Sequence, residues 1–270
     1  MPTWEARVSR GTAPADRVDA ELRYAFAAPL VRDAALWIDL GCGTGVPAGA
    51  ALAGRPLAGR AILVDREPDA LDKAARETGA EVAAAVEADL STAEGAAAVP
   101  AAIAGAGIDG PRVVTCFDVL HQLADFTALV DLLLALGEDG ATVLLSVPDD
   151  AAGGLDDPHR ESAWSAGAAE ELRRLLPPGA VSFSQVPVRA AAIVPAAGGE
   201  SAPLGGVTVA AGQPPSHHLL AFGPDAGRLA GASLARAADL DAERADARRR
   251  ESDLAYLEAR LARVEAPAAG

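Results

Sequence analysis

Short apolar runs alternate with alanine-rich segments of helical spacing along much of the chain. The runs, each bounded by Gly, Pro or Asp, cover residues 35–40, 61–64, 81–87, 112–117 and 142–147. Helices are expected between them, at residues 47–53, 68–78, 91–104 and 126–136. Strands that alternate with helices form parallel sheets with right-handed crossovers. The pattern therefore predicts an α/β fold with a doubly wound parallel sheet.

A cap helix is predicted before the first run. Leu22, Phe26 and Leu30 recur at helical spacing, which places this helix at residues 18–31. Pro29 is expected to bend the helix or end it early, because proline lacks the N–H that an interior helical position uses. Residues 1–33 are therefore assigned to an N-terminal arm and cap helix.

Beyond the fifth run the order of elements changes. A polar loop is expected at residues 148–160, a helix at 168–176, and two further apolar runs at 181–194 and 218–222. A Gly/Pro-rich stretch separates the two runs, which favours an antiparallel pair that closes one edge of the sheet. The main domain is expected to span residues 34–224.

The last segment, residues 225–270, is rich in Ala, Arg, Glu, Asp and Leu. It predicts a helix of about 40 residues, roughly 60 Å long at 1.5 Å per residue. Leu254, Leu257, Leu261 and Val264 follow the spacing of a coiled coil, which would serve a homo-oligomer or a protein partner. A single solvated helix is the alternative, because the apolar stripe is narrow.

Composition narrows the expected setting and partners. Hydrophobic residues make up 50% of the chain but aromatic residues only 4%, so the core is expected to consist mainly of Ala, Val and Leu. The formal net charge of −15 repels phosphate backbones, so we expect no nucleic-acid partner. Two cysteines, Cys42 and Cys116, suit a reducing cytoplasm. No apolar run approaches the ~20 residues that a membrane span needs.

One glycine-rich stretch, "WIDLGCGTGV" at Trp37–Val46, stands between the first predicted strand and the first predicted helix. Gly41, Gly43 and Gly45 alternate there, as in loops whose backbone turns sharply or approaches a ligand. Asp65 ends the second run, where a carboxylate can accept hydrogen bonds from both hydroxyls of a ribose. The two features together predict a site for a nucleoside cofactor.

Two cofactors compete for this loop. Gly43-x-Gly45-x-x-Ala48 matches the loose dinucleotide fingerprint, so a nicotinamide-dependent oxidoreductase is one alternative. Asp39 argues against it, because a carboxylate two residues before Gly41 repels a pyrophosphate. The same carboxylate attracts an ammonium or sulfonium group.

Four motifs occur in order along the chain: "WIDLGCGTG", "ILVDREPDAL", "VEADL" and "VVTCFDVLHQL". In this order and spacing they resemble the successive motifs of class I S-adenosylmethionine-dependent methyltransferases, over about residues 24–224. The resemblance implies a Rossmann-like sheet of seven strands in the order 3-2-1-4-5-7-6, with the last strand antiparallel. It also implies S-adenosylmethionine as the cofactor.

The resemblance further implies a role for each matching residue. The first motif would line the methionine moiety, the acid of the second would hold the ribose, and the third would meet the adenine. The implied cofactor residues are Asp39, Gly41, Cys42, Gly43, Gly45, Asp65, Arg66, Asp89, Leu90, Phe117 and Asp118. Each of these residues also has a structural alternative. Taken alone, Asp65 or Asp89 is typical of a helix N-cap, and Cys42 is typical of a small packing residue.

Methyl transfer needs alignment and water exclusion more than a protein nucleophile. A hydroxyl acceptor benefits from a general base, and His121 and His159 are the predicted catalytic residues. Many family members carry Glu-His where this chain has His121 and Gln122, so the usual role at this point is in doubt. His121, Asp118 and Asp149 lack the spacing of a metal site, and no metal is expected.

The sequence therefore predicts an S-adenosylmethionine-dependent methyltransferase that acts on a hydroxyl of a small molecule or glycan. The alternative is a methyltransferase-like domain that has lost catalysis and serves as an assembly module through its last helix.

Overall fold

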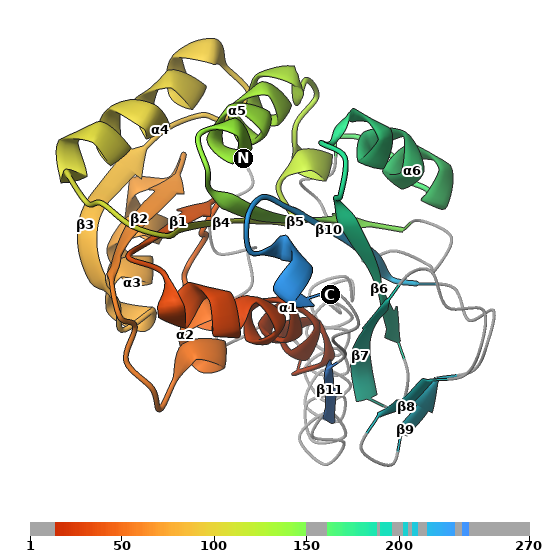
Figure 1. The fold of residues 1–270 in the computed structure, drawn as a ribbon. Coiled ribbons are helices and arrows are strands. Elements are labelled where there is room, and N and C mark those ends of the chain that lie inside the picture. The colour runs from red at the N-terminus through yellow and green to blue at the C-terminus, as the bar shows by residue number, and fades with distance from the viewer. Residues whose placement is uncertain are drawn as a thin grey trace, which may run out of the picture.

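The computed structural model describes residues 14–149, 161–187, 190–195, 202–204, 207–209, 215–229 and 234–237. These residues form three layers, a mixed sheet between two sets of helices (Figure 1). One face carries α1 (Pro14–Asp33), α2 (Val46–Leu52) and α3 (Pro68–Glu77). The other carries α4 (Ala93–Ala106), α5 (Thr127–Glu138) and α6 (Ala166–Leu175).

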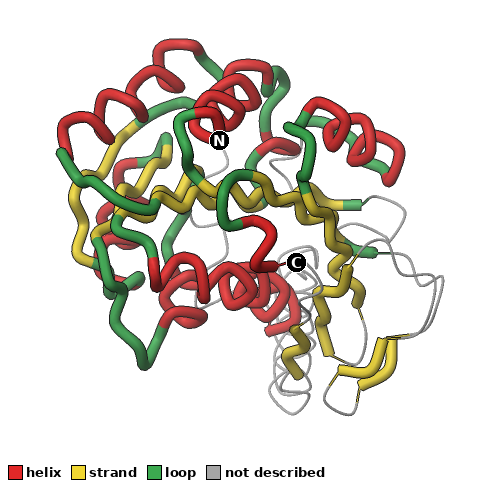
Figure 2. The backbone as a smooth tube through the Cα atoms, in the orientation of Figure 1, coloured by secondary structure: helices red, strands yellow, loops and turns green. Residues whose placement is uncertain are grey.

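Five parallel strands form one side of the sheet, as the apolar runs predict. They are β1 (Leu36–Leu40), β2 (Arg60–Asp65), β3 (Glu81–Glu87), β4 (Arg112–Phe117) and β5 (Thr142–Pro148). Their order is β3-β2-β1-β4-β5, and each neighbouring pair is parallel. All five carboxyl ends therefore meet at one edge of the sheet. Figure 2 shows the strands in yellow between the two sets of helices in red.

The sheet continues beyond β5 with antiparallel pairs. The added strands are β10 (His217–Phe222), β6 (Val181–Pro187), β7 (Ala190–Pro195) and β11 (Leu234–Ala237), in that spatial order. Strand β10 lies between β5 and β6 and is antiparallel to both. The seven neighbouring strands from β3 to β6, in which β10 is the seventh along the chain, thus confirm the expected order 3-2-1-4-5-7-6 with an antiparallel last strand. A separate hairpin pairs β8 (Ala202–Leu204) with β9 (Val207–Val209).

Two expectations about this side of the sheet are wrong. The run at residues 181–194 is a hairpin of β6 and β7 rather than one strand, in keeping with the usual strand length of roughly 3–10 residues. The pair of β6 and β10 does not close the edge, because β7 and β11 extend the sheet past β6.

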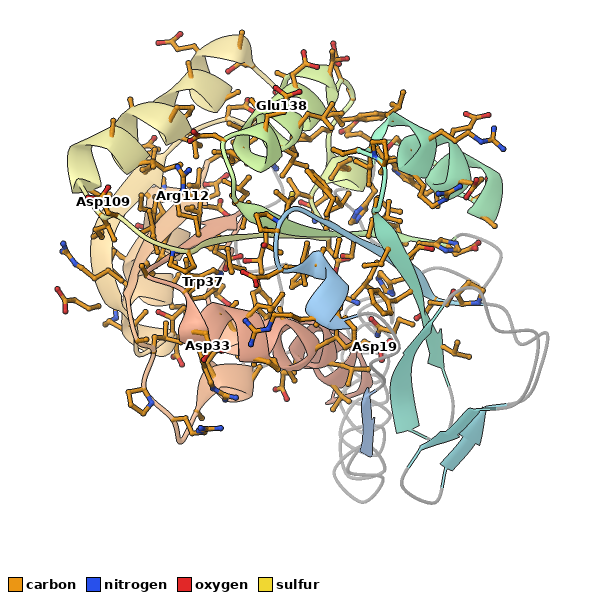
Figure 3. The ribbon with its side chains drawn as sticks, in the orientation of Figure 1. Asp19, Asp33, Trp37, Asp109, Arg112 and Glu138 are labelled. Carbon is orange, nitrogen blue, oxygen red and sulfur yellow. The ribbon has the colours of Figure 1, made fainter. Side chains whose placement is uncertain are left out.

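The core lies in two apolar layers, one on each face of the sheet. Alternate residues of β1 serve both: Leu36, Ile38 and Leu40 face the α4–α5–α6 layer, and Trp37 faces the α1–α2–α3 layer. Figure 3 shows Trp37 inside the fold, whereas Asp109 and Glu138 lie at its surface. Small side chains let the helices approach closely; a Cβ on Gly49 of α2 would lie 2.0 Å from the Glu77 carbonyl of α3.

Helix α1 is longer than expected and contains Pro29 in its interior. Phe26, Leu30 and Val31 on both sides of the proline are at most 4% exposed. Burial of these side chains on α2 and the sheet outweighs the hydrogen bond that the proline removes, so the helix continues to Asp33. The expectation that Pro29 ends this helix early is wrong.

The expected C-terminal helix does not begin at Asp225. The structure has a 3₁₀ turn, η4 (Ala226–Leu229), and then strand β11. Side-chain contacts on the sheet override helical propensity here, since Ala226 and Leu229 are buried in the α1 layer. The coiled-coil residues Leu254, Leu257, Leu261 and Val264 lie outside the described residues.

Candidate functional site

The carboxyl ends of the parallel strands bring five aspartates to one edge. Asp39 and Asp65 lie in β1 and β2, and Asp89, Asp118 and Asp149 follow β3, β4 and β5. Ligands of doubly wound sheets bind at this edge. The sequence-predicted residues therefore lie on neighbouring strands, from the end of β3 across β2 and β1 to the end of β4.

The glycine loop is a left-handed turn fastened to β2. Gly41, Gly43 and Gly45 have φ angles of 71°, 54° and 71°, in the region that glycine adopts most readily. The amides of Gly41 and Cys42 both donate to the Val64 carbonyl, at 2.8 and 3.0 Å. The loop is thus held in a fixed shape before any ligand arrives.

Internal packing accounts for two of the three glycines. A Cβ on Gly41 would lie 2.4 Å from Cγ2 of Val119, and one on Gly45 would lie 2.6 Å from the Cα of Ala74 in α3. Heavy atoms do not approach this closely, so neither position has room for a side chain. That the three glycines line the methionine moiety stays a prediction.

Asp39 is completely buried and faces α1. Its carboxylate accepts hydrogen bonds from the Tyr24 hydroxyl, at 3.1 and 3.2 Å, and from the Thr115 hydroxyl, at 2.6 Å. Trp37 Nε1 in turn donates to the Thr115 oxygen at 2.8 Å. Burial and the nearby Asp65 raise the pKa of Asp39 to about 7, against the lowering effect of the two hydroxyls. Asp39 therefore supplies a buried charge that titrates near neutral pH.

Asp65 ties the glycine loop to the end of β2. One carboxylate oxygen accepts the Gly43 amide at 2.9 Å and the other accepts the Glu67 amide at 3.0 Å. Asp65 thereby holds the Gly43 amide and the N-cap residue of α3 in place at the ligand edge. Arg66, which follows, is exposed, and its side chain lies 3.9 Å from the Glu67 carboxylate.

Asp89 lies exposed just past β3. Its Oδ1 accepts both the amide and the hydroxyl of Ser91, at 3.0 and 2.7 Å. These hydrogen bonds and the charge of Arg66 lower the pKa of Asp89. The N-cap of α4 is Thr92 rather than Asp89, because the Thr92 hydroxyl accepts the Gly95 amide. Leu90 is buried in the α4 layer, so only its backbone can face a ligand.

Asp118 directly follows β4 and is the one non-glycine residue with positive φ, 58°, among those the structure describes. Ser146 of β5 holds it twice: its hydroxyl accepts the Asp118 amide at 3.1 Å and donates to Oδ1 at 3.0 Å. Arg23 of α1 pairs with Oδ2, and His217 Nε2 lies 3.4 Å from Oδ1. Asp118 is thus oriented from three elements.

The charges around Asp118 set its ionisation. Burial raises the pKa of Asp118. Arg23, His217, His121 and the Ser146 hydroxyl lower it by more than burial raises it, so the pKa of Asp118 is lowered overall. Burial and Arg23 together lower the pKa of His217 to about 3, despite the attraction of Asp118. At neutral pH the network therefore holds an ionised carboxylate beside a neutral imidazole.

The two predicted catalytic histidines have different outcomes. His121 lies in the 3₁₀ turn η2 (Leu120–Gln122), 5% exposed, and its carbonyl accepts the amides of Glu161 and Ser162. This joins the turn after β4 to the segment after β5. His159 lies outside the described residues, so its prediction is untested.

The cysteines and candidate metal ligands add no chemistry to this edge. Cys42 and Cys116 are buried and form no disulfide, and burial first, then the charges of Asp39 and Asp118, raise the pKa of Cys116. In the part of the chain that the structure describes, no three His, Cys, Asp or Glu side chains form a metal-binding group. Within the same part, no helix is long and apolar enough to cross a membrane.

Sequence reasoning missed several residues that α1, β4, β5, β6 and β10 bring to this edge. These are Arg23, Tyr24, Thr115, Ser146, Gln185 and His217. One signal was available for Arg23 and Tyr24, because both directly precede an apolar stretch of the same helix, residues 25–31. A charged side chain in such a helix is expected to have a buried partner.

Comparisons with known proteins place these features in context. A family model described as a methyltransferase domain matches residues 15–183. Among proteins of curated function, none matches the chain. Solved structures that match include a possible histamine N-methyltransferase from Thermotoga maritima, at 12% identity and a TM-score of 0.45, covering 77% of this chain and 90% of that one.

Two further structural matches carry RNA in their titles. One is the small RNA methyltransferase HEN1, at 15% identity and a TM-score of 0.48, covering 83% of this chain and 26% of that one. The other is the Pnkp1/Rnl/Hen1 RNA repair complex, at 10% identity and a TM-score of 0.46, covering 76% and 41%. This chain thus spans less than half the length of either matched chain.

These two matches correct the expected partners. The expectation of no nucleic-acid partner, which rested on the net charge of −15, is withdrawn because a small RNA methyltransferase and an RNA repair complex are among the similar structures. Net charge is a sum over the whole molecule, whereas a nucleic acid responds to the local potential of the surface that it meets.

Proposed function

The chain belongs to the methyltransferase domain family and its cofactor is S-adenosylmethionine, and from this premise we propose that it methylates a hydroxyl oxygen of a small molecule or glycan. When bound, the cofactor supplies a methyl group on a sulfonium. The observation that carries the proposal is the position of His121 in η2, just past the end of β4 at the ligand edge, where its carbonyl accepts the amides of Glu161 and Ser162.

The cofactor residues proposed from the motifs fit this donor. The four acids Asp39, Asp65, Asp89 and Asp118 follow the edge of the sheet, and a carboxylate attracts the sulfonium and ammonium groups of the methionine end. Asp65 lies at the carboxyl end of β2, a position suited to accept ribose hydroxyls, and Asp89 lies exposed past β3, a position suited to accept the adenine amino group. Phe117 closes the side towards α1, where its ring meets Tyr24 edge to face at 5.1 Å.

The hydroxyl acceptor is proposed from the charges at the end of β4. In this proposal the charge of Asp118 is shared between Arg23 and the methionine ammonium, so little of it is left to attract a cationic amine acceptor. Asp118 has a lowered pKa and is a weak base, which suits orienting a hydroxyl rather than removing its proton. We propose His121 as the group that takes the proton, with His159 as the second candidate.

The test starts with calorimetric titration of S-adenosylhomocysteine, followed by transfer of labelled methyl from S-adenosylmethionine to a panel of phenols, sugars and RNA. We expect the label in hydroxyl compounds, and at least a hundredfold loss of kcat for His121→Asn, within the usual range for a general base. Labelled RNA alone, or label on nitrogen, would overturn the proposed acceptor. Cofactor binding without transfer to any compound would favour a domain that has lost catalysis.

A further inference from the structure

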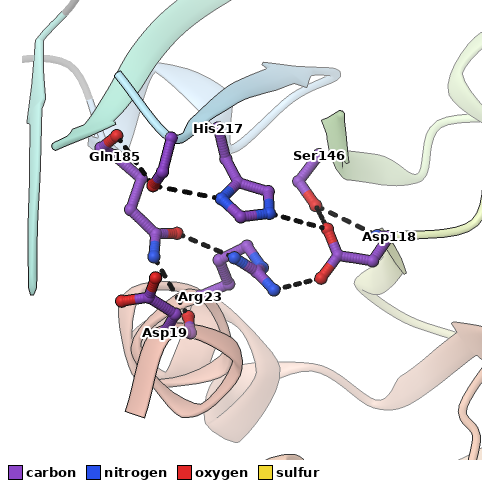
Figure 4. A network of polar contacts seen from close by, with 7 residues as sticks. Asp19, Arg23, Asp118, Ser146, Gln185 and His217 are labelled. Atoms are coloured by element: carbon purple, nitrogen blue, oxygen red, sulfur yellow. Dashed lines mark hydrogen bonds and ion pairs between the residues drawn. The ribbon is translucent and has the colours of Figure 1, made fainter. Parts of the chain in front are cut away.

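Arg23 links helix α1 to two strands of the sheet. Its side chain is 3% exposed, and its two terminal nitrogens separate to different partners: Nη1 donates to Gln185 Oε1 of β6 at 2.9 Å, and Nη2 pairs with Asp118 Oδ2 (Figure 4). Gln185 also donates to the Asp19 carbonyl one turn earlier in α1, at 3.3 Å. The guanidinium therefore fixes the position of α1 against both β4 and β6.

The network has one accessible end. Arg23, Gln185, Ser146 and His217 are each at most 5% exposed, whereas the Asp118 side chain keeps 26% of its surface accessible. Three buried groups thus converge on a carboxylate that stands at the ligand edge of the sheet. Its backbone, at a φ of 58°, has a conformation that costs free energy unless surrounding contacts maintain it.

Stability alone is a weak reason for such a network. A buried ion pair loses its hydration, and replacing one with apolar side chains often leaves a protein equally stable. Arg23 lies in a helix whose neighbours Leu22, Ala27 and Ala28 are apolar and buried, so an apolar residue would pack there. The pair is better explained by what it does to the exposed carboxylate.

We propose that Arg23 is a positioning residue for the cofactor, which orients Asp118 towards the methionine end of S-adenosylmethionine and keeps that carboxylate charged. The inference rests on the proposed function, in which Asp118 stands beside the methionine ammonium. The inference adds a role for α1 to the proposed function. This helix contains none of the acids of the four motifs, yet it sets the geometry of the reacting end.

The charges around Asp118 determine what a test must separate. The titratable groups that interact with Asp118 are Arg23 and Tyr24 of α1, Cys116 of β4, His121 of η2 and His217 of β10; next to His217, His218 pairs with Asp149. Asp39 titrates near neutral pH, and neither Arg23 nor Asp118 is among the groups that shift its pKa. The informative quantity is therefore the difference between a variant and the wild type at each pH, from which the Asp39 contribution cancels.

The experiment is titration of S-adenosylhomocysteine into the full chain between about pH 5.5 and 8.5. Arg23→Gln removes the charge that keeps Asp118 ionised, so we expect binding about tenfold weaker than wild type at low pH, with a difference that narrows as pH rises. Arg23→Lys keeps a charge and is expected to restore most of the affinity. Arg32→Gln is the matched control, because Arg32 of α1 donates to the Ala51 carbonyl instead.

Asp118→Asn completes the design, since it is expected to weaken binding at every pH and to make Arg23→Gln neutral when the two are combined. Equal affinity of Arg23→Gln and wild type across the range would overturn the inference alone. So would an equal loss at all pH values, or one that Arg32→Gln shares, because each indicates a structural role. Absence of binding to the wild type would instead overturn the proposed function.

Discussion

Two halves of the candidate site are built in different ways. In the glycine-loop half, which comprises residues 39–45, 65–67 and 89–91, the bonds between motifs are short in sequence, such as the 22 residues between Gly43 and Asp65. In the Arg23 half, which comprises Arg23, Asp118, Ser146, Gln185 and His217, partners lie 95 and 162 residues apart. The first half is thus held mainly by bonds between neighbouring motifs, with Asp39 as the exception, because it accepts from Thr115, 76 residues later; the second half is a product of the tertiary fold.

This difference has a functional meaning. A nucleoside is the same molecule for every enzyme that uses it, so a local loop with fixed backbone donors can recognise it. The reacting end must suit one particular acceptor, and here α1, β5, β6 and β10 jointly determine its shape. The predictions below test whether the glycine-loop half and the Arg23 half are held by different sets of contacts.

The largest effect is expected from a side chain in the glycine loop. Gly45→Ala places a Cβ at φ 71° and 2.6 Å from the backbone of Ala74, so unfolding free energy should fall by about 3 kcal/mol or more. Gly41→Ala meets the movable Val119 side chain instead and should cost less, about 2 kcal/mol. Urea denaturation measures both.

Val119→Ala is the matched second change for this pair. It should recover part of the loss in Gly41→Ala and none of it in Gly45→Ala. Equal recovery of unfolding free energy in both variants would show that local packing does not cause the loss. It would also weaken the distinction between a rigid glycine loop and an adaptable reacting end.

Asp39→Asn tests the residue that belongs to the loop but is held by Tyr24 of α1. The pKa of Asp39 rises from 3.8 to about 7 on folding, so the stability of the wild type falls as pH rises between these values. The amide does not titrate, so the variant should exceed the wild type by about 2 to 4 kcal/mol above pH 7. Below about pH 4 the two should agree.

Urea denaturation at about pH 4 and pH 8 gives this difference, and S-adenosylhomocysteine titration should show weaker binding by the more stable variant. If the difference in unfolding free energy between the variant and the wild type is the same at both pH values, Asp39 is charged throughout this range. The hydrogen bonds from Tyr24 and Thr115 would then outweigh the effect of burial on Asp39.

Asp65→Ala is expected to act mainly on binding. It removes the proposed ribose acceptor and the anchor of the Gly43 amide, so S-adenosylhomocysteine binding should weaken by about 1 to 3 kcal/mol. Isothermal calorimetry measures the loss. If Arg23→Gln and Asp65→Ala act on separate halves, their effects at neutral pH should add within about 0.5 kcal/mol.

The smallest effect on folding is expected from Asp89→Ala. Asp89 is exposed and bonds only to Ser91 two residues on, so unfolding free energy should change by no more than about 0.5 kcal/mol. Loss of an adenine contact should nevertheless weaken the cofactor by about 1 kcal/mol. Sinefungin or adenosine competition would show whether the adenine end is responsible, and unchanged affinity would make Asp89 a turn residue only.

The same contrast explains what could be read from the sequence. β3 and β4 have the bounds that the apolar runs predict, and Asp65 and Gly43 meet as their motifs imply. Nothing near Asp118 in the sequence indicates that Arg23, 95 residues earlier, would pair with it. The errors at Pro29 and Asp225 share this origin, because tertiary packing overrode a local preference at both.

The position of β10 also imposes an order on the biosynthesis of the protein. A nascent chain emerges with its N-terminal part first, so β1 to β5 and the glycine loop are complete well before His217 is made. Until β10 inserts between β5 and β6, the free edge of β5 is a template on which another nascent chain could pair. The glycine-loop half is therefore synthesised early, whereas the Arg23 half stays incomplete, and the edge of β5 stays unpaired, until β10 has been synthesised.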